Sequence, residues 1–227
     1  MRLVKMSLKM EASGKAVRRI PVNVRSLTGR VNGQEFESSL ERDLLLLVHW
    51  DFDVDWYQVQ PLKIEYVDAK GSARQYTPDL FVSYRAVKGA KVQRKPLLCE
   101  VKYRDDIAKQ WKLLKPKLKA ARKYARERGW DFSVLTEREI RTPYLKNVQF
   151  LWSYRFAHFH EHHYEHLRLT LEELGESDVN TLLEVAYSSK ALRGEALWTL
   201  WCMVARRWVK CDLNELLTMQ TVMWVDS

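Results

Sequence analysis

Two short stretches decide the expected fold: Tyr76-Thr77-Pro78-Asp79 and, further along the chain, Leu97-Leu98-Cys99-Glu100-Val101-Lys102. The second stretch predicts a hydrophobic strand in which Glu100 and Lys102 share one face, because alternate side chains of a strand point to the same side. Charges in such a strand are costly unless a metal ion or an ion pair compensates them. Asp79 and Glu100 can bind a hard divalent cation through oxygen atoms, while Lys102 can position an attacking water or help to deprotonate it.

A third carboxylate comes from a helix that we expect at residues 37–49, where leucines recur at helical spacing. Its Glu41 can join the other three groups at one phosphodiester, and such a set would make a nuclease centre. Glu37 lies one turn earlier on the same face and is the rival for this role. The structural alternative for the strand residues is an ion pair between Asp79 and Lys102. An Asp followed at a distance by Glu-x-Lys also occurs by chance in many α/β proteins, so the context must decide.

Composition points to a folded protein that buries a real core. The 227 residues are 46% hydrophobic and 30% charged, which is ordinary for a globular chain. No apolar run approaches the roughly twenty residues that a membrane-spanning helix needs, and the first residues lack the apolar segment of a signal peptide. Cys99, Cys202 and Cys211 are too few and too scattered for a disulfide framework or a zinc cluster. We therefore expect a cytoplasmic protein with no membrane contact.

The net charge of +9 is unevenly distributed along the chain. Residues 1–34 hold eight basic residues and one acidic residue, whereas residues 160–227 hold six basic and eleven acidic residues. A basic arm and a basic central region suit a polyanion such as DNA, and the acidic end suits protein contacts. The alternative for each charged block is a solvated surface. The candidate DNA-binding residues are Arg18, Arg19 and Arg25 in the arm, and Lys109, Lys112 and Lys119 in a later basic helix.

The central region predicts a mixed α/β domain. Two-fold alternation indicates four strands, followed by a long basic helix at residues 107–128 and a buried strand at 131–135. Pro116 should split or kink that helix, and Gly129 should end it. Thr136 and Glu139 have the spacing of a capping box, which predicts another short helix. The four strands are expected at residues 56–60, 62–67, 76–84 and 97–103.

The C-terminal third predicts a small, mainly helical domain. Three helices followed by a hairpin are typical of a winged helix. We expect a basic arm at residues 1–34, a catalytic α/β domain at 35–157 and a winged-helix-like domain at 158–227. The expected helices cover residues 164–174, 178–187 and 192–209, and the hairpin strands cover 209–213 and 221–225. A histidine-rich run at residues 158–166 permits a zinc site, but it lacks the usual accompanying ligands, so a polar linker is the favoured interpretation.

Several motifs together resemble the TnsA family, the endonuclease subunits of heteromeric bacterial transposases. The similarity spans about residues 30–155 with order and spacing kept, and extends to the wider restriction-endonuclease-like fold. The motifs are Phe36-Glu37-Ser38-Ser39-Leu40-Glu41-Arg42-Asp43, His49-Trp50-Asp51-Phe52-Asp53-Val54, Gln60-Pro61-Leu62, Tyr76-Thr77-Pro78-Asp79, Glu100-Val101-Lys102, Gly129-Trp130-Asp131-Phe132 and Leu135-Thr136-Glu137-Arg138-Glu139-Ile140.

This resemblance implies a function and a set of site residues. Glu41, Asp79, Glu100 and Lys102 would be catalytic, with the three acids binding Mg²⁺, for which Mn²⁺ can substitute. Some members have Gln at the position of Glu100, where a carboxylate is the better ligand. The protein would cut double-stranded transposon-end DNA at the 5′ ends, beside a DDE-type transposase and an AAA+ ATPase regulator in a bacterial cytoplasm. Two alternatives stay open: a stand-alone restriction or repair nuclease, and a non-catalytic assembly subunit.

Overall fold

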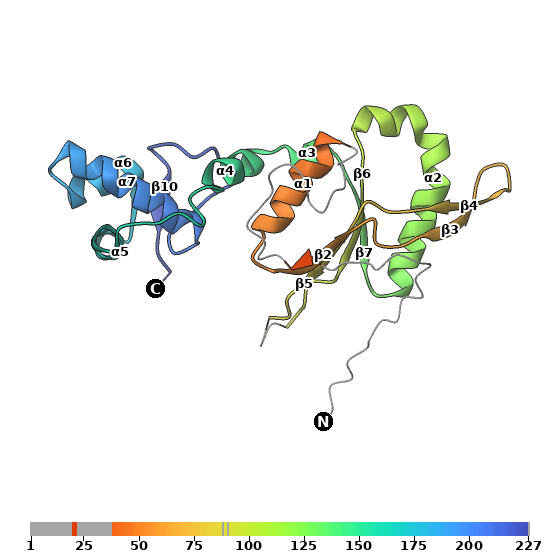
Figure 1. Ribbon diagram of the computed structural model, residues 1–227, viewed down its shortest axis with the longest axis horizontal. Helices are drawn as coiled ribbons and strands as arrows, with labels where there is room; N and C mark the ends of the chain where they lie inside the picture. The colour runs from red at the N-terminus through yellow and green to blue at the C-terminus, as the bar shows by residue number, and fades with distance from the viewer. Residues whose placement is uncertain (1–19, 22–37, 88, 90, 227) are drawn as a thin grey trace, which may run out of the picture. The chain divides into compact units, whose positions relative to one another are not determined.

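The computed structural model describes residues 20–21, 38–87, 89 and 91–226 (Figure 1). They form two compact units, each treated by itself. The sheet unit comprises residues 20–21 and 51–135, and the helical unit comprises residues 38–50 and 136–226. The bounds of these units differ from those of the domains expected at 35–157 and 158–227, and that division into domains stays a prediction. Among the described residues, no helix is long and apolar enough to cross a membrane.

A mixed five-stranded sheet forms the centre of the sheet unit in the described part of the chain. Its order is β1-β2-β5-β6-β7, antiparallel except for the parallel pair β6–β7. Such a parallel pair needs a long crossover, which the intervening helix α2 (Arg104–Glu127) supplies. The expected α/β fold with a mixed sheet and flanking helices is therefore confirmed. The strands are β1 (Ile20–Pro21), β2 (Val54–Val59), β5 (Leu80–Tyr84), β6 (Leu97–Val101) and β7 (Asp131–Leu135).

The prediction of one strand at residues 76–84 is wrong, because this segment is divided between two strands. The first part belongs to β4 (Ala73–Tyr76), which pairs with β3 (Ile64–Val67) in a separate hairpin. Pro78 lies at the break, where a residue without an N–H cannot continue a ladder. The chain then enters the main sheet as β5. This change of partner places Asp79 directly before Leu80, the first residue of β5.

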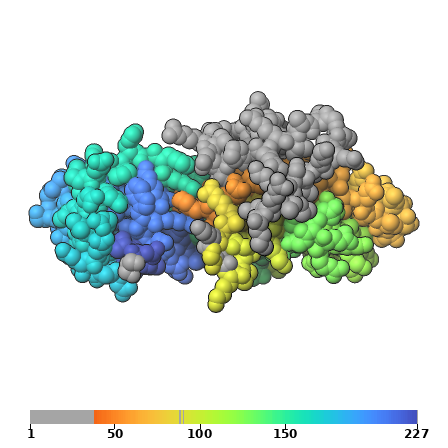
Figure 2. Space-filling view, turned by 90° about the horizontal axis from the view of Figure 1, so that it is seen from below, coloured from red at the N-terminus to blue at the C-terminus, as the bar shows by residue number. Residues whose placement is uncertain are grey.

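Helix α2 (Arg104–Glu127) is continuous with Pro116 inside it, so of the two expected effects, a split or a kink, the split does not occur. Figure 1 shows the helix as two arms joined by a sharp bend, which agrees with the predicted kink, since proline is a usual cause of bends. The helix ends as expected: Gly129 follows it with φ 71°, a conformation that favours glycine. The β3–β4 hairpin lies beside α2 and projects beyond it (Figure 1, Figure 2).

One hydrophobic cluster of the sheet unit lies between α2 and one face of the sheet. Residues of α2 are buried at the three- and four-residue spacing that places them on a single face. They meet aromatic and aliphatic side chains of β3, β4, β5 and β6. The buried members of this cluster are Ile64, Tyr76, Phe81, Leu98, Ala121 and Ala125. This packing brings the C-terminal arm of α2 against the strand that contains Glu100.

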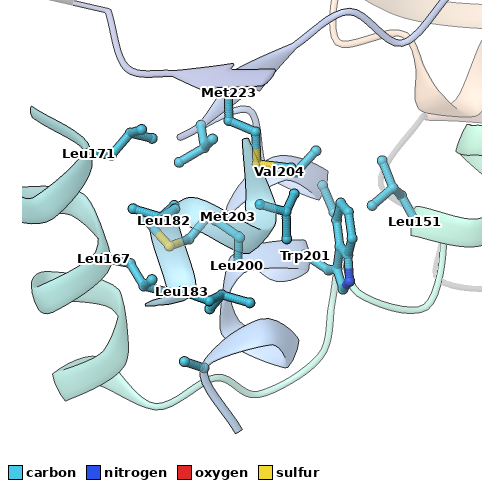
Figure 3. Close-up of a cluster of buried hydrophobic side chains, with 14 of the residues drawn as sticks. Leu151, Leu167, Leu171, Leu182, Leu183, Leu200, Trp201, Met203, Val204 and Met223 are labelled. Atoms are coloured by element: carbon cyan, nitrogen blue, oxygen red, sulfur yellow. The ribbon is translucent and has the colours of Figure 1, made fainter. Parts of the chain in front are cut away.

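The helical unit has its own core (Figure 3). Leucines of α5 and α6 meet the apolar middle of α7, and Met223 of β10 covers them. The antiparallel pair β9–β10 confirms the predicted hairpin, while β8, which completes the order β8-β10-β9, was not expected. The winged-helix assignment itself stays a prediction. The elements are α1 (Ser39–Trp50), α3 (Glu137–Ile140), α4 (Pro143–Leu151), α5 (Glu161–Leu174), β8 (Glu176–Asp178), α6 (Val179–Ala186), α7 (Lys190–Ala205), β9 (Lys210–Cys211) and β10 (Val222–Trp224).

Candidate active site

Asp79 and Glu100 are neighbours across adjacent strands. In the β5–β6 register Leu80 pairs with Cys99, so one further step places Asp79 opposite Glu100. The backbone N–H of Asp79 donates to the carbonyl of Cys99 at 3.1 Å. The Asp79 carboxylate in turn accepts a hydrogen bond from the backbone N–H of Val101, with 2.6 Å between Oδ2 and N. The structure thus fixes Asp79 against β6, beside the Glu100-Val101-Lys102 stretch.

Glu100 is buried, with only 3% of its surface exposed. Both of its carboxylate oxygens have a donor inside the sheet unit. The Tyr76 hydroxyl donates to Oε2 at 2.6 Å, and the Lys117 ammonium donates to Oε1 at 2.8 Å. Glu100 therefore forms its ion pair with Lys117 of α2.

Lys102 follows the last residue of β6. Its backbone N–H donates to the carbonyl of Leu135 at 3.0 Å and extends the parallel pairing with β7. That Lys102 shares the face of Glu100 stays a prediction from the alternation of strand side chains. Within the described residues Lys102 forms no ion pair, so the structural alternative of an Asp79–Lys102 pair is wrong.

Tyr76 and Lys117 are the site residues that sequence reasoning missed. The Lys117 ammonium lies 4.6 Å from the centre of the Tyr76 ring, so Tyr76, Glu100 and Lys117 form one closed cluster. Burial, and then the negative charge of Glu100, raises the pKa of the Tyr76 hydroxyl far above its usual range, so that it stays a donor. Tyr76 belongs to the same stretch as Asp79, Tyr76-Thr77-Pro78-Asp79, so its place in that motif was a signal for a role in the site. Nothing in the spacing of the α2 lysines distinguishes Lys117.

Glu41 belongs to the helical unit and lies in the first turn of α1. Its backbone N–H donates to the Ser38 hydroxyl at 3.2 Å, and that hydroxyl donates to its carboxylate at 3.0 Å. This is the Ser-x-x-Glu pattern of a helix start, with Ser38 as the capping residue. The role of Glu41 beside Asp79 and Glu100, which lie in the other unit, stays a prediction.

The expected DNA contacts are only partly described. Lys109, Lys112 and Lys119 are exposed on α2, as phosphate contacts require. The arm residues Arg18, Arg19 and Arg25, and also Glu37, lie outside the described residues.

The histidine-rich run is not a linker over most of its length, because α5 begins at Glu161. His163 is 1% exposed, and its Nδ1 lies 2.8 Å from the Tyr187 hydroxyl. Among the described residues no group of three or more His, Cys, Asp or Glu side chains could hold a metal ion. The run thus gives no zinc site in that part of the chain.

A mixed sheet with two carboxylates and a lysine at the end of adjacent central strands is the arrangement of the restriction-endonuclease-like class. Two family models match the chain. One, described as TnsA-like endonuclease N terminal, matches residues 51–137, and the other, described as TnsA endonuclease C terminal, matches residues 139–213. The chain belongs to the TnsA family, the endonuclease subunits of transposases. No curated protein matches it significantly.

Proposed function

We propose that this protein is the metal-dependent DNA endonuclease of a heteromeric transposase, and that it cuts the 5′ ends of the transposon in cut-and-paste transposition. The observation that supports this most strongly is the position of Asp79 opposite Glu100 across β5 and β6, directly before the Lys102 position. The family match supplies the transposase context.

The donor set fits Mg²⁺. This ion prefers oxygen ligands and is commonly held by one or two carboxylates, with water and substrate phosphate completing its shell. Asp79 and Glu100 supply two such carboxylates on neighbouring strands, and Glu41 is the proposed third. Mn²⁺ accepts the same oxygen ligands and can substitute. When bound, the ion would stabilise the charge that develops on the phosphate and lower the pKa of an attacking water.

The chain's own residues supply position and charge. The N–H of Val101 fixes the orientation of Asp79, and Lys102 orients the attacking water beside the strand end. The exposed lysines of α2 and the basic arm bind the phosphates of double-stranded transposon-end DNA, which positions the duplex without selecting a sequence. A DDE-type transposase would cut and join the 3′ ends. An AAA+ ATPase regulator would contact the acidic C-terminal region.

The test replaces Lys102 by Ala and assays strand cleavage with the transposase and ATPase partners present. We expect loss of 5′-end cuts, intact 3′-end cuts, and unchanged DNA and partner binding. Lys63→Ala removes an exposed lysine from the same unit and is the matched control. Normal 5′-end cutting by the Lys102 variant would overturn the catalytic assignment and favour an assembly subunit. Specific cleavage by the purified chain alone would favour a stand-alone nuclease.

A further inference from the structure

When no cation is bound, Glu100 needs a positively charged partner within the protein. A carboxylate with 3% exposure loses almost all of its hydration, and an uncompensated charge in that position is strongly disfavoured. Lys117 provides the compensation: its Nζ lies 2.8 Å from Oε1 of Glu100. Tyr76 holds the other oxygen through a neutral hydroxyl.

Lys117 is held in this position from two sides. Its side chain is only 18% exposed, and its ammonium lies 4.6 Å from the centre of the Tyr76 ring, where the face of an aromatic ring attracts a cation. The neighbouring lysines of the same helix, Lys115 and Lys119, are exposed. Lys117 is thus an inward-facing exception on a helix whose other basic residues face solvent.

A divalent cation that uses Glu100 as a ligand must share a carboxylate whose two oxygens already accept hydrogen bonds. The Tyr76 hydroxyl is neutral and can remain on Oε2. The Lys117 ammonium is a like charge next to the incoming ion, and the repulsion between them is strong at such distances in a partly buried site. The cation and Lys117 therefore compete for Oε1.

We propose that Lys117 is a displaceable counter-ion of Glu100, which holds this metal ligand in place before the cation binds and sets the cation concentration at which the site fills. It is a positioning residue that acts through Glu100. This inference rests on the proposed function, since it requires that Glu100 binds the catalytic ion.

The test measures binding of Mn²⁺ alone to the full chain, by electron paramagnetic resonance of the free ion, together with the melting temperature. Lys117→Met removes the charge and keeps a side chain of similar length. We expect it to lower the melting temperature without metal and to tighten Mn²⁺ binding roughly ten-fold, within the usual range for coupling between two ligands. Saturating Mn²⁺ should raise the melting temperature more in the variant than in the wild type. Lys115→Met, which removes one exposed charge from the same helix, should change neither quantity.

Each outcome has a separate meaning. Equal or weaker Mn²⁺ binding by Lys117→Met than by the wild type, together with loss of Mn²⁺ binding in the single variant Glu100→Ala, would overturn the counter-ion role and leave the metal site standing. Absence of Mn²⁺ binding by both the wild type and Lys117→Met would overturn the metal site itself. If Lys117→Met does not fold, Lys117→Gln keeps a hydrogen-bond donor without the charge, and the same tightening is expected and required.

Discussion

Replacing Tyr76 by Phe removes a single hydroxyl from the centre of the candidate site. Tyr76 is 6% exposed, and its hydroxyl donates to Oε2 of Glu100 at 2.6 Å. A hydrogen bond to a charged group contributes about 1.5–3 kcal/mol, and the variant leaves a buried acceptor without its donor. We expect the free energy of unfolding to fall by about 2 kcal/mol near neutral pH. For a chain of this size that corresponds to a decrease in melting temperature of about 4–8 °C.

The same variant should change the dependence of stability on alkaline pH. Because burial and Glu100 raise the pKa of Tyr76 above its ordinary value of 10.0, the folded protein keeps this proton while the unfolded chain loses it. The contribution is therefore complete below pH 10 and is lost as pH rises further. One pH unit above that value costs about 1.4 kcal/mol per such tyrosine. The Phe variant lacks this loss, so its stability should fall less steeply between pH 10 and pH 11.

Urea unfolding at pH 8 and pH 11, followed by circular dichroism, measures both effects. Tyr66→Phe removes a hydroxyl from a half-buried position of β3 and is the control for loss of a phenol. An unchanged unfolding midpoint at pH 8, with the same alkaline loss as the wild type, would refute the argument that the Tyr76 hydroxyl supports a buried, charged Glu100.

Two further predictions concern the helical unit. Leu200 is fully buried in the core of this unit, so Leu200→Ala should lower the free energy of unfolding by about 2–5 kcal/mol. Thermal denaturation measures this change, and a loss under about 1 kcal/mol would contradict the packing described for Leu200. Burial, and then the charge of His162, lowers the pKa of His163 from its ordinary value of 6.5. On acidification the unfolded chain therefore binds this proton before the folded protein does, and stability should fall as the pH drops below about 6.5. His163→Asn should lose less stability between pH 7 and pH 5, and an unchanged acid limb would exclude His163 as its cause.

The sheet and the strand residues of the site could be predicted because their signals are local. Alternating residues define a strand, and the strand places Glu100 and Lys102 on one face. The break at Pro78 was also visible, since a proline inside an expected strand indicates an edge or an end. Applied strictly, that rule would have separated β4 from β5. The capping box between Thr136 and Glu139, another local pattern, was predicted and is present.

The partners of Glu100 could not be predicted, because they depend on packing between elements distant in sequence. Lys117 is one of many basic residues on α2, and only the seating of that helix on the sheet selects it. The histidine-rich run shows a different failure. His163, Leu167, Thr170 and Leu171 are buried at helical spacing, so the periodicity of α5 extends into the run. A pattern of apolar residues does not reveal this, because the residues of the run are mostly polar.

The three proposed metal ligands share one physical feature: each carboxylate is oriented by hydrogen bonds before any ion arrives. Asp79 accepts from the backbone of β6, Glu100 accepts from Tyr76 and Lys117, and Glu41 accepts from Ser38. Orientation in advance reduces the entropy that ion binding would otherwise cost. Glu100 accepts one of its hydrogen bonds from a cation, the Lys117 ammonium. Arrival of a divalent ion therefore disturbs the charge balance at Glu100, and the exchange with Lys117 should govern how readily the site fills.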